Sequence, residues 1–234
     1  MFIKNAKHLI NKIFLNYFKK PFYIEKMQKY LISTGFVLDV GCGNHAPSKF
    51  KRYFPEIQYL GVDRSLSYNL DDDDFSLMNK FFKINLDNLS ELKMLPNNYF
   101  DCILVVHVIE HLRHPLDVIK GLIKKLKKGG FLYLEYPSQK SAFLPRMRPP
   151  FFQSSLNFHD DPSHICVPDT MKIVSLINES DCRTLQYGAR RSWKRIMLLP
   201  LYLINSIYCF HKIDGGVFWD VLGFADYIVS VKNA

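Results

Sequence analysis

The chain has 234 residues, of which 48% are hydrophobic and 15% aromatic, which is enough for one domain with a sizeable core. Its five cysteines are scattered and form no Cys-x-x-Cys pair, which argues against a disulfide framework or a zinc site and favours a cytoplasmic location. The net charge of +9 favours anionic partners. The most apolar run, 196–210, contains Pro200 and falls short of the roughly 20 residues that span a bilayer, so we expect no transmembrane helix.

Strands and helices alternate along the first half of the chain. Residues 2–33 have a lysine-rich amphipathic pattern interrupted by Pro21, which predicts two helices. A later amphipathic segment predicts a helix over 115–127, closed by Gly129-Gly130. Short apolar runs predict buried strands at 36–40, 58–62, 81–86, 101–106 and 131–136. This alternation predicts a parallel sheet with helices on both faces.

The second half of the chain is less regular. Residues 139–167 are rich in proline and predict a long loop or lid, and 168–179 predict a helix. Two candidate closing strands, 183–187 and 227–231, are separated by an insertion at 190–224. No linker divides the chain into two domains.

An acidic residue interrupts the first strand, just before a glycine turn. Residues 37–43 have the sequence V-L-D-V-G-C-G, in which Gly41 and Gly43 permit a tight turn and let a ligand approach the backbone. Ala46 stands where the dinucleotide fingerprint has its third glycine. A buried carboxylate such as Asp39 needs a partner, and either the turn or a cationic ligand amine would supply one.

A second acid follows the next strand. Residues 60–63 have the sequence L-G-V-D, which places Asp63 about 20 residues after the turn, where ribose hydroxyls bind in dinucleotide-binding folds. A lone aspartate here would more often cap a helix or a turn. Two acids at these positions around one glycine turn favour a nucleoside cofactor.

Further segments match the same pattern. The matching segments are V-L-D-V-G-C-G at 37–43, Y-L-G-V-D at 59–63, L-P-N-N-Y-F-D at 95–101, V-I-E-H-L at 108–112 and L-K-K-G-G at 126–130. Together they resemble the motifs of class I S-adenosylmethionine-dependent methyltransferases over roughly residues 35–138, with Lys128 in place of the family's usual proline. The resemblance implies a Rossmann-like, mostly parallel seven-stranded sheet with helices on both faces and its last strand antiparallel.

The resemblance also implies one methyltransferase domain over residues 1–234. Its parts would be N-terminal helices at 1–33, a cofactor-binding core at 35–138, and a substrate-side loop, insertion and closing strands at 139–234.

S-adenosylmethionine is the cofactor that the resemblance implies. Asp39 would support the glycine turn and the methionine amine, and Asp63 would bind the ribose hydroxyls. Arg64 would flank the adenine and Asp87 would face its amine, with Asn85 nearly as well placed. The remaining expected contacts are the turn residues and the residue after the fourth strand, at the methionine end: Gly41, Cys42, Gly43 and His107.

Two segments could be read as metal sites. Residues 107–111 have the sequence H-V-I-E-H, a zinc-peptidase pattern, but that chemistry needs both histidines on one helix, and His107 ends a buried strand. The four acids at 71–74 are better explained as solvated side chains. We therefore predict no bound metal and expect Glu110 and His111 to support the cofactor pocket or to face the substrate.

Histidines and carboxylates gather again at residues 158–164, F-H-D-D-P-S-H, in a non-periodic loop after the fifth strand. In this fold such a loop overhangs the sheet edge where ligands bind. A histidine paired with an aspartate can take a proton from a hydroxyl near neutral pH, whereas the alternative is a turn stabilised by aspartate and proline. The candidate catalytic residues are His159, His164, Asp160 and Asp161, with His111 as the rival base.

These patterns predict methyl transfer to an oxygen. The [DN]-P-P-[YFW] signature of amino-group methylases is absent after the fourth strand. Small chains with a D-x-x-H loop resemble bacterial enzymes that methylate sugars or phosphoryl-bearing groups of surface polysaccharides, and the net charge of +9 fits an anionic acceptor such as a nucleotide sugar or a lipid-linked glycan. The alternatives are an RNA or protein methyltransferase, which the charge also fits, and a non-catalytic cofactor-binding subunit. Nucleic acid is the less favoured partner, and peripheral contact with a membrane stays open.

Overall fold

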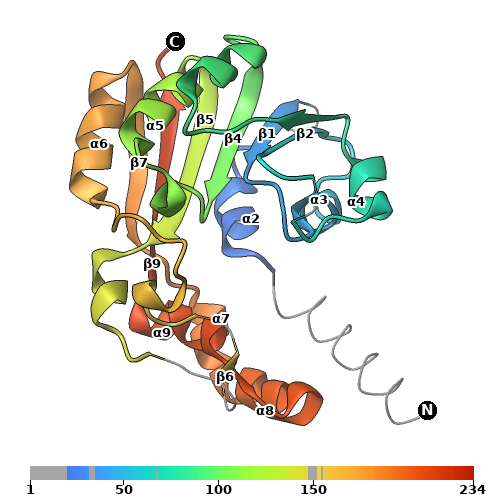
Figure 1. Ribbon diagram of the computed structural model, residues 1–234, viewed down its shortest axis with the longest axis vertical. Coiled ribbons are helices and arrows are strands. Elements are labelled where there is room, and N and C mark those ends of the chain that lie inside the picture. Colours follow the sequence, from blue (N-terminus) through green and yellow to red (C-terminus); the bar gives the residue numbers. More distant parts are fainter. Residues whose placement is uncertain (1–19, 32–34, 67, 147–151, 154) are drawn as a thin grey trace.

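A computed structural model describes residues 20–31, 35–66, 68–146, 152–153 and 155–234 (Figure 1). The strands of its main sheet are β1 (Phe36–Val40), β2 (Gln58–Asp63), β3 (Lys80–Lys83), β4 (Phe100–Val106), β5 (Leu126–Pro137), β7 (Cys182–Ala189) and β9 (Ala225–Lys232). Their order in the sheet is β3-β2-β1-β4-β5-β9-β7. Only β9, the last strand, pairs antiparallel with its neighbours β5 and β7. The expected Rossmann-like sheet of seven strands is confirmed.

Helices cover both faces of this sheet. Buried aliphatic side chains of α5 (Pro115–Ile123) and α6 (Thr170–Glu179) form one core with the strands. Side chains of α2 (Phe22–Met27) and α3 (Ala46–Lys51) form a second core on the opposite face, and α4 (Asp72–Leu77) packs against α3. Two separate apolar layers on one sheet follow from the near-continuous apolar strands, whose side chains alternate between the faces.

The helix expected over 115–127 is shorter than predicted. The helix α5 ends at Ile123, before the lysines at 124, 125 and 127, and β5 already begins at Leu126, so Gly129-Gly130 lies inside a strand. Long-range contacts decide this boundary. The ammonium group of Lys125 is buried and donates to the carbonyl oxygen of Leu95 at 2.7 Å, and Leu126 pairs with Phe100 of β4.

The second half of the chain builds a small subdomain beyond the end of the sheet. After β5 come the 3₁₀ helix η3 (Gln139–Phe143), the short strand β6 (Phe152–Gln153) and the 3₁₀ helix η4 (Phe158–Asp160). The insertion forms α7 (Trp193–Met197), α8 (Leu199–Phe210), β8 (Ile213–Asp214), η5 (Gly215–Phe218) and α9 (Trp219–Leu222). The strands β6 and β8 pair with each other. Figure 1 shows the insertion beyond the edge at which β4 ends, the edge where this fold binds ligands.

Two further expectations concern the N-terminal helices and the length of the apolar helices. Of the two helices expected in residues 2–33, the first lies outside the described residues, and α2 belongs to the second. Within the described part of the chain, none of the helices combines the length and the apolarity that a bilayer-spanning segment requires.

Candidate active site

The chain leaves β1 through a turn that requires glycine. Gly41 has φ +77°, in the left-handed region that favours glycine, and its N–H donates to the carbonyl oxygen of Val62 at 2.7 Å. A Cβ on Gly41 would lie 2.3 Å from Cγ2 of Val108, and a Cβ on Gly43 would lie 2.6 Å from the ring of Tyr68. Both glycines therefore keep backbone and neighbouring side chains within a distance that no other residue allows.

Asp39 lies at the floor of the site, on β1. Its carboxylate is buried and accepts a hydrogen bond from the hydroxyl of Tyr59 at 2.5 Å. Burial raises the pKa of this carboxyl to about 7, and the hydrogen bond from Tyr59 lowers it by less. Asp39 lines a cavity of about 290 Å³. A cation bound in this cavity would favour the ionised carboxylate.

A second cavity, of about 420 Å³, lies beside the first and shares five lining residues with it: Gly41, Tyr68, His107, His111 and Asp161. The residues expected at the ribose and adenine end all line this second cavity: Asp63, Arg64, Asn85 and Asp87. The structure therefore brings the expected ribose and adenine residues together on one side of the glycine turn. Asp39, expected at the methionine amine, lines the cavity on the other side.

Backbone contacts fix the two carboxylates of the second cavity. Asp63 accepts from the N–H of Ser65 at 3.0 Å, and Asp87 accepts from the N–H of Arg113 at 2.9 Å. Their directions are therefore set by the fold. Cys42, also expected at the cofactor, is buried beneath the turn and its side chain lines neither cavity, so only its backbone can take part.

Tyr68 is a site residue that the sequence did not reveal. It lines both cavities, and its carbonyl oxygen accepts from the N–H of Asn44 at 2.9 Å, which fixes it against the glycine turn. Its ring lies where a Cβ on Gly43 would be. The signal in the sequence is an aromatic residue in the short segment 64–70, between Asp63 and the acidic run.

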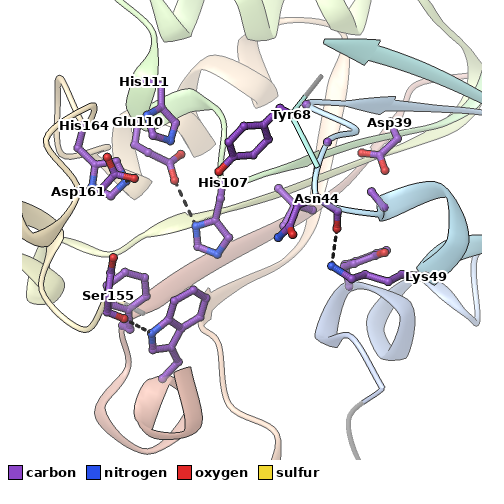
Figure 2. A pocket seen from close by; sticks show the side chains of 17 residues that line it. Asp39, Asn44, Lys49, Tyr68, His107, Glu110, His111, Ser155, Asp161 and His164 are labelled. Atoms are coloured by element: carbon purple, nitrogen blue, oxygen red, sulfur yellow. Dashed lines mark hydrogen bonds and ion pairs between the residues drawn. The ribbon is translucent and has the colours of Figure 1, made fainter. Parts of the chain in front are cut away.

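His107 occupies the middle of the first cavity, with Glu110, His111, Asp161 and His164 on one side of it (Figure 2). Its Nδ1 lies 3.2 Å from Oε1 of Glu110, and its Nε2 lies 3.6 Å from Oε1 of Glu135. Burial alone lowers the pKa of His107, but its contacts with the two glutamates outweigh burial and raise the pKa to about 9. His107 therefore carries a positive charge at neutral pH.

A buried ion network lies behind His107. Arg190 contacts Oε1 of Glu135 at 2.8 Å and Oδ2 of Asp220 at 3.4 Å, and Arg195 contacts the same Asp220 oxygen at 3.4 Å. Burial acts to raise the pKa of Glu135, but the charge of Arg190 and the contacts of His107 and Tyr133 together outweigh burial and lower the pKa to about 2. This network was not predicted from the sequence, although an acid inside the apolar run 131–136 is the same signal that marked the acid of the first strand.

The loop at 158–164 contributes two residues to the first cavity. Asp161 and His164 line it together with His111, and the rings of the two histidines lie 4.8 Å apart. Nδ1 of His164 lies 2.6 Å from the carbonyl oxygen of Phe158, and Nδ1 of His111 lies 3.2 Å from that of Ser163. A carbonyl oxygen only accepts, so in the neutral ring Nδ1 of His164 carries the proton and Nε2 keeps a lone pair. Nδ1 of His111 also lies 3.0 Å from the hydroxyl of Ser163, which donates to Asp161 at 2.6 Å, so Nδ1 is the donor in His111 as well.

The other two loop candidates lie outside the cavity. His159 is exposed and packs edge-on against Phe158. Asp160 accepts from the N–H groups of Leu156 and Asn157 and so caps η4. The structure therefore brings His111, Asp161 and His164 together but gives His159 and Asp160 a place in the loop's own architecture.

The histidines also form a group with metal-ligand spacing. A ring nitrogen of His111, a ring nitrogen of His164 and a carboxylate oxygen of Glu110 lie within 4.8 Å of one another. His107 belongs to neither of the two such groups found among the described residues, because Glu110 and Glu135 engage it. The zinc-peptidase pattern of the sequence is therefore not formed as such.

The acidic run after β2 is structural. Asp71 caps α4, and Asp74 is buried, where it accepts from the hydroxyl of Ser48 at 2.5 Å and contacts Nδ1 of His45 at 2.6 Å. The expectation that all four acids are solvated was wrong for Asp74. Its contacts hold the start of α3 against α4, directly after the glycine turn.

The sheet order, the glycine turn and the two acids beside it define the fold and the cofactor site of class I S-adenosylmethionine-dependent methyltransferases. A family model described as a methyltransferase domain matches residues 15–187, most of the chain. The chain belongs to this methyltransferase family, and its cofactor is S-adenosylmethionine.

Individual proteins agree with this assignment. An uncharacterised methyltransferase of Schizosaccharomyces pombe is 33% identical over 116 residues, which cover 45% of this chain and 41% of that protein. A SAM-dependent methyltransferase structure from Archaeoglobus fulgidus has a TM-score of 0.58 at 18% identity, over 95% of this chain and 99% of that one. An S-adenosylmethionine-dependent methyltransferase from Mesorhizobium loti has a TM-score of 0.63 at 11% identity, over 92% and 100%. At these identities the two structures show a shared fold.

Proposed function

We propose that this protein transfers the methyl group of S-adenosylmethionine to an oxygen of a small or glycan-linked acceptor in surface-polysaccharide biosynthesis. One observation carries the proposal: Asp39 and the glycine turn line the same cavity as His111, Asp161 and His164. Methyl transfer is an in-line displacement that depends on positioning and desolvation. An oxygen of high pKa also needs a base, and the two histidines keep an Nε2 lone pair for that role.

The charge of the molecule supports an anionic acceptor. A net charge of +9 favours a phosphorylated sugar or a lipid-linked glycan over a neutral acceptor. The described cysteines are all free, in keeping with a reaction in the cytoplasm.

The experiment that tests this function is incubation of the pure protein with labelled S-adenosylmethionine and fractionated cell extract. Label in a polar glycan or sugar-phosphate fraction supports the proposal. Label in RNA or protein would overturn the acceptor class. Cofactor binding without transfer to any fraction, joined to copurification of a partner enzyme, would instead indicate a non-catalytic subunit. We expect the cofactor to bind in the micromolar range, about −8 kcal/mol, by calorimetry.

Asp63→Ala is expected to weaken cofactor binding and to leave the fold intact. Losing a charge-assisted hydrogen bond to the ribose should reduce the binding free energy by about 1.5–3 kcal/mol. Calorimetric titration with S-adenosylhomocysteine measures the change. The matched control is Asp73→Ala, because Asp73 is an exposed acid that lines neither cavity. Equal affinities of the parent and the Asp63 variant would reduce Asp63 to a turn residue.

Cofactor affinity is expected to rise with pH up to about pH 7. The pKa of Asp39 in the free protein is raised to about 7, and the cationic methionine amine favours the ionised carboxylate. Below pH 7 binding then releases a proton, so affinity should increase by up to about tenfold per pH unit and level off above it. Calorimetry between about pH 5.5 and 8.5 measures this dependence. Asp39→Asn should flatten it, and a flat profile of the parent would remove Asp39 from the amine site.

The raised pKa of Asp39 also makes the stability of the cofactor-free fold depend on pH. The folded-state pKa lies above the ordinary aspartate pKa of 3.8, so this carboxyl stabilises the cofactor-free fold at low pH and loses that contribution as the pH rises through about 7. Bound cofactor should remove the loss. The free protein is therefore expected to gain more thermal stability from cofactor at pH 8 than at pH 5.

We further propose that cofactor binding needs no metal. The two carboxylates of the ribose and adenine cavity, Asp63 and Asp87, are fixed by backbone N–H groups, and neither belongs to the group of Glu110, His111 and His164. His111 lines the same cavity, but the expected ribose and adenine contacts do not depend on it. Affinity for S-adenosylhomocysteine should be the same before and after treatment with a chelator, with metal content measured by mass spectrometry. Stoichiometric zinc whose removal abolishes cofactor binding would contradict this.

A further inference from the structure

An exposed apolar stripe runs along α7 and α8. Trp193 and Met197 of α7 are 71% and 79% exposed, and Ile204 of α8 is 63% exposed, with Leu201 and Ile207 also exposed. The spacing of these five residues is four, four, three and three, so they lie on one side of a helical path. Leu198 alone separates the two helices, and its N–H bonds back to Lys194.

The core does not explain this stripe. On the other side of α8, Tyr202 and Ser206 are buried, and the helix packs there against β8 and η5. Figure 1 shows α8 at the far end of the molecule, away from the main sheet. Single exposed apolar residues are ordinary, but a contiguous row across two helices marks an interaction surface.

The charges beside the stripe select its partner. No acidic residue occurs from 182 to 213, between Asp181 and Asp214. Arg191, Lys194 and Lys212 are exposed in and next to the two helices. An aliphatic row with a tryptophan at one end and lysine and arginine beside it is the pattern of a helix that lies in the interface of an anionic bilayer. With 12 residues, α8 is too short to cross one.

We propose that the exposed face of α7 and α8 docks on an anionic membrane surface, with the stripe in the headgroup region. The stripe belongs to the same insertion that closes the active site. Trp219 and Phe224 line the first cavity beside His107, and Arg195 of α7 pairs with Asp220 of α9. Docking of this face therefore places the cavity near the lipid surface.

One consequence rests on the proposed function: the acceptor is then a lipid-linked, phosphate-bearing glycan, presented where the cavity meets the membrane. Membrane docking itself does not depend on methyl transfer. A lipid anchor would also hold the acceptor at high local concentration, since both partners are confined to one surface.

The test is flotation of the full chain with vesicles of phosphatidylcholine alone and with about 30% phosphatidylglycerol, without cofactor or acceptor. We expect binding to the anionic vesicles, weakened between about 0.1 M and 0.5 M salt. Ile204→Glu should reduce partitioning at least about tenfold, because it places a charge in the stripe. The matched control is Met94→Glu, because Met94 is 56% exposed and lies at the end of the 3₁₀ helix η1 (Leu89–Met94), before the start of β4, whereas the insertion lies beyond the end of β4; this variant should bind as the parent does.

Joint replacement of Arg191, Lys194 and Lys212 by alanine should abolish the preference for anionic vesicles, at about fivefold per residue. Vesicle binding that Ile204→Glu leaves unchanged would place the contact elsewhere in the chain and overturn the proposal. A dimer that Ile204→Glu dissociates, with no vesicle binding by the parent, would make the stripe an interface between copies and overturn it too. Vesicle binding without methyl transfer to any acceptor would keep this inference and sink only the proposed function.

Discussion

His164→Ala is expected to lower the rate of methyl transfer by about 10²–10⁴ and to leave cofactor affinity nearly unchanged. The Phe158 carbonyl oxygen fixes the proton on Nδ1 of His164, so Nε2 is available to take the acceptor's proton. Oδ2 of Asp161 lies 3.9 Å from Nε2 and favours the imidazolium that forms. Single-turnover rates and calorimetric affinities measured on the same preparations separate chemistry from binding.

Two further variants serve as the control and as the test of the alternative base. His159→Ala is the matched control, because His159 lies five residues before His164 but is exposed outside the cavity, and it should transfer at the parent rate. His111→Ala tests the rival base, whose Nδ1 contacts Ser163 and whose ring faces His164. If His111→Ala stops transfer while His164→Ala does not, the base is His111. If all three variants transfer normally, the acceptor oxygen is already nucleophilic, as a phosphoryl oxygen is, and no histidine acts as a base.

Local patterns carried most of the fold and the cofactor half of the site. A buried parallel strand appears in the sequence as an apolar run, and a cofactor-binding turn appears as glycines next to an acidic residue. The segment 36–43 and Asp63 could therefore be recognised from neighbouring residues alone. The end of α5 could not. Two glycines after a lysine-rich turn indicate a helix end, but pairing of Leu126 with Phe100, distant in sequence, makes them part of β5.

The acceptor half depended on contacts between distant residues. The loop at 158–164 was recognised as a cluster, but only the folded chain shows that Asp161 and His164 turn toward His111 while Asp160 turns back to cap η4. The ion network behind His107 joins residues 55 and 30 positions apart in the sequence. No periodicity or local motif predicts such a pairing, although an acid in an apolar strand indicates that a partner must exist, because a buried unpaired carboxylate is costly.

Arg190→Met is expected to lower the free energy of unfolding by about 3–5 kcal/mol, the largest stability effect of any single change considered. The side chain of Arg190 is buried between Glu135 and Asp220, and removing it leaves two carboxylates in the core with less compensation. Chemical denaturation at pH 7, followed by circular dichroism, measures the change. The loss should be partly reversed in the double variant with Glu135→Gln, because that variant no longer buries an uncompensated glutamate charge.

The stability of the parent protein at low and at high pH tests the same ion network. The pKa of Glu135 is lowered to about 2, so its contribution to stability is present above the ordinary glutamate pKa of 4.5 and is lost as the pH falls toward 2. The pKa of His107 is raised to about 9, so its contribution is present below the ordinary histidine pKa of 6.5 and is lost as the pH rises toward 9. The stabilisation by this network is therefore greatest between about pH 4.5 and 6.5. Because Arg190 helps to hold the pKa of Glu135 down, Arg190→Met should remove much of the acid limb, that is, the loss of stability as the pH falls from 4.5 toward 2. An Arg190→Met variant as stable as the parent, with an unchanged acid limb, would show that water rather than Arg190 compensates the buried glutamate.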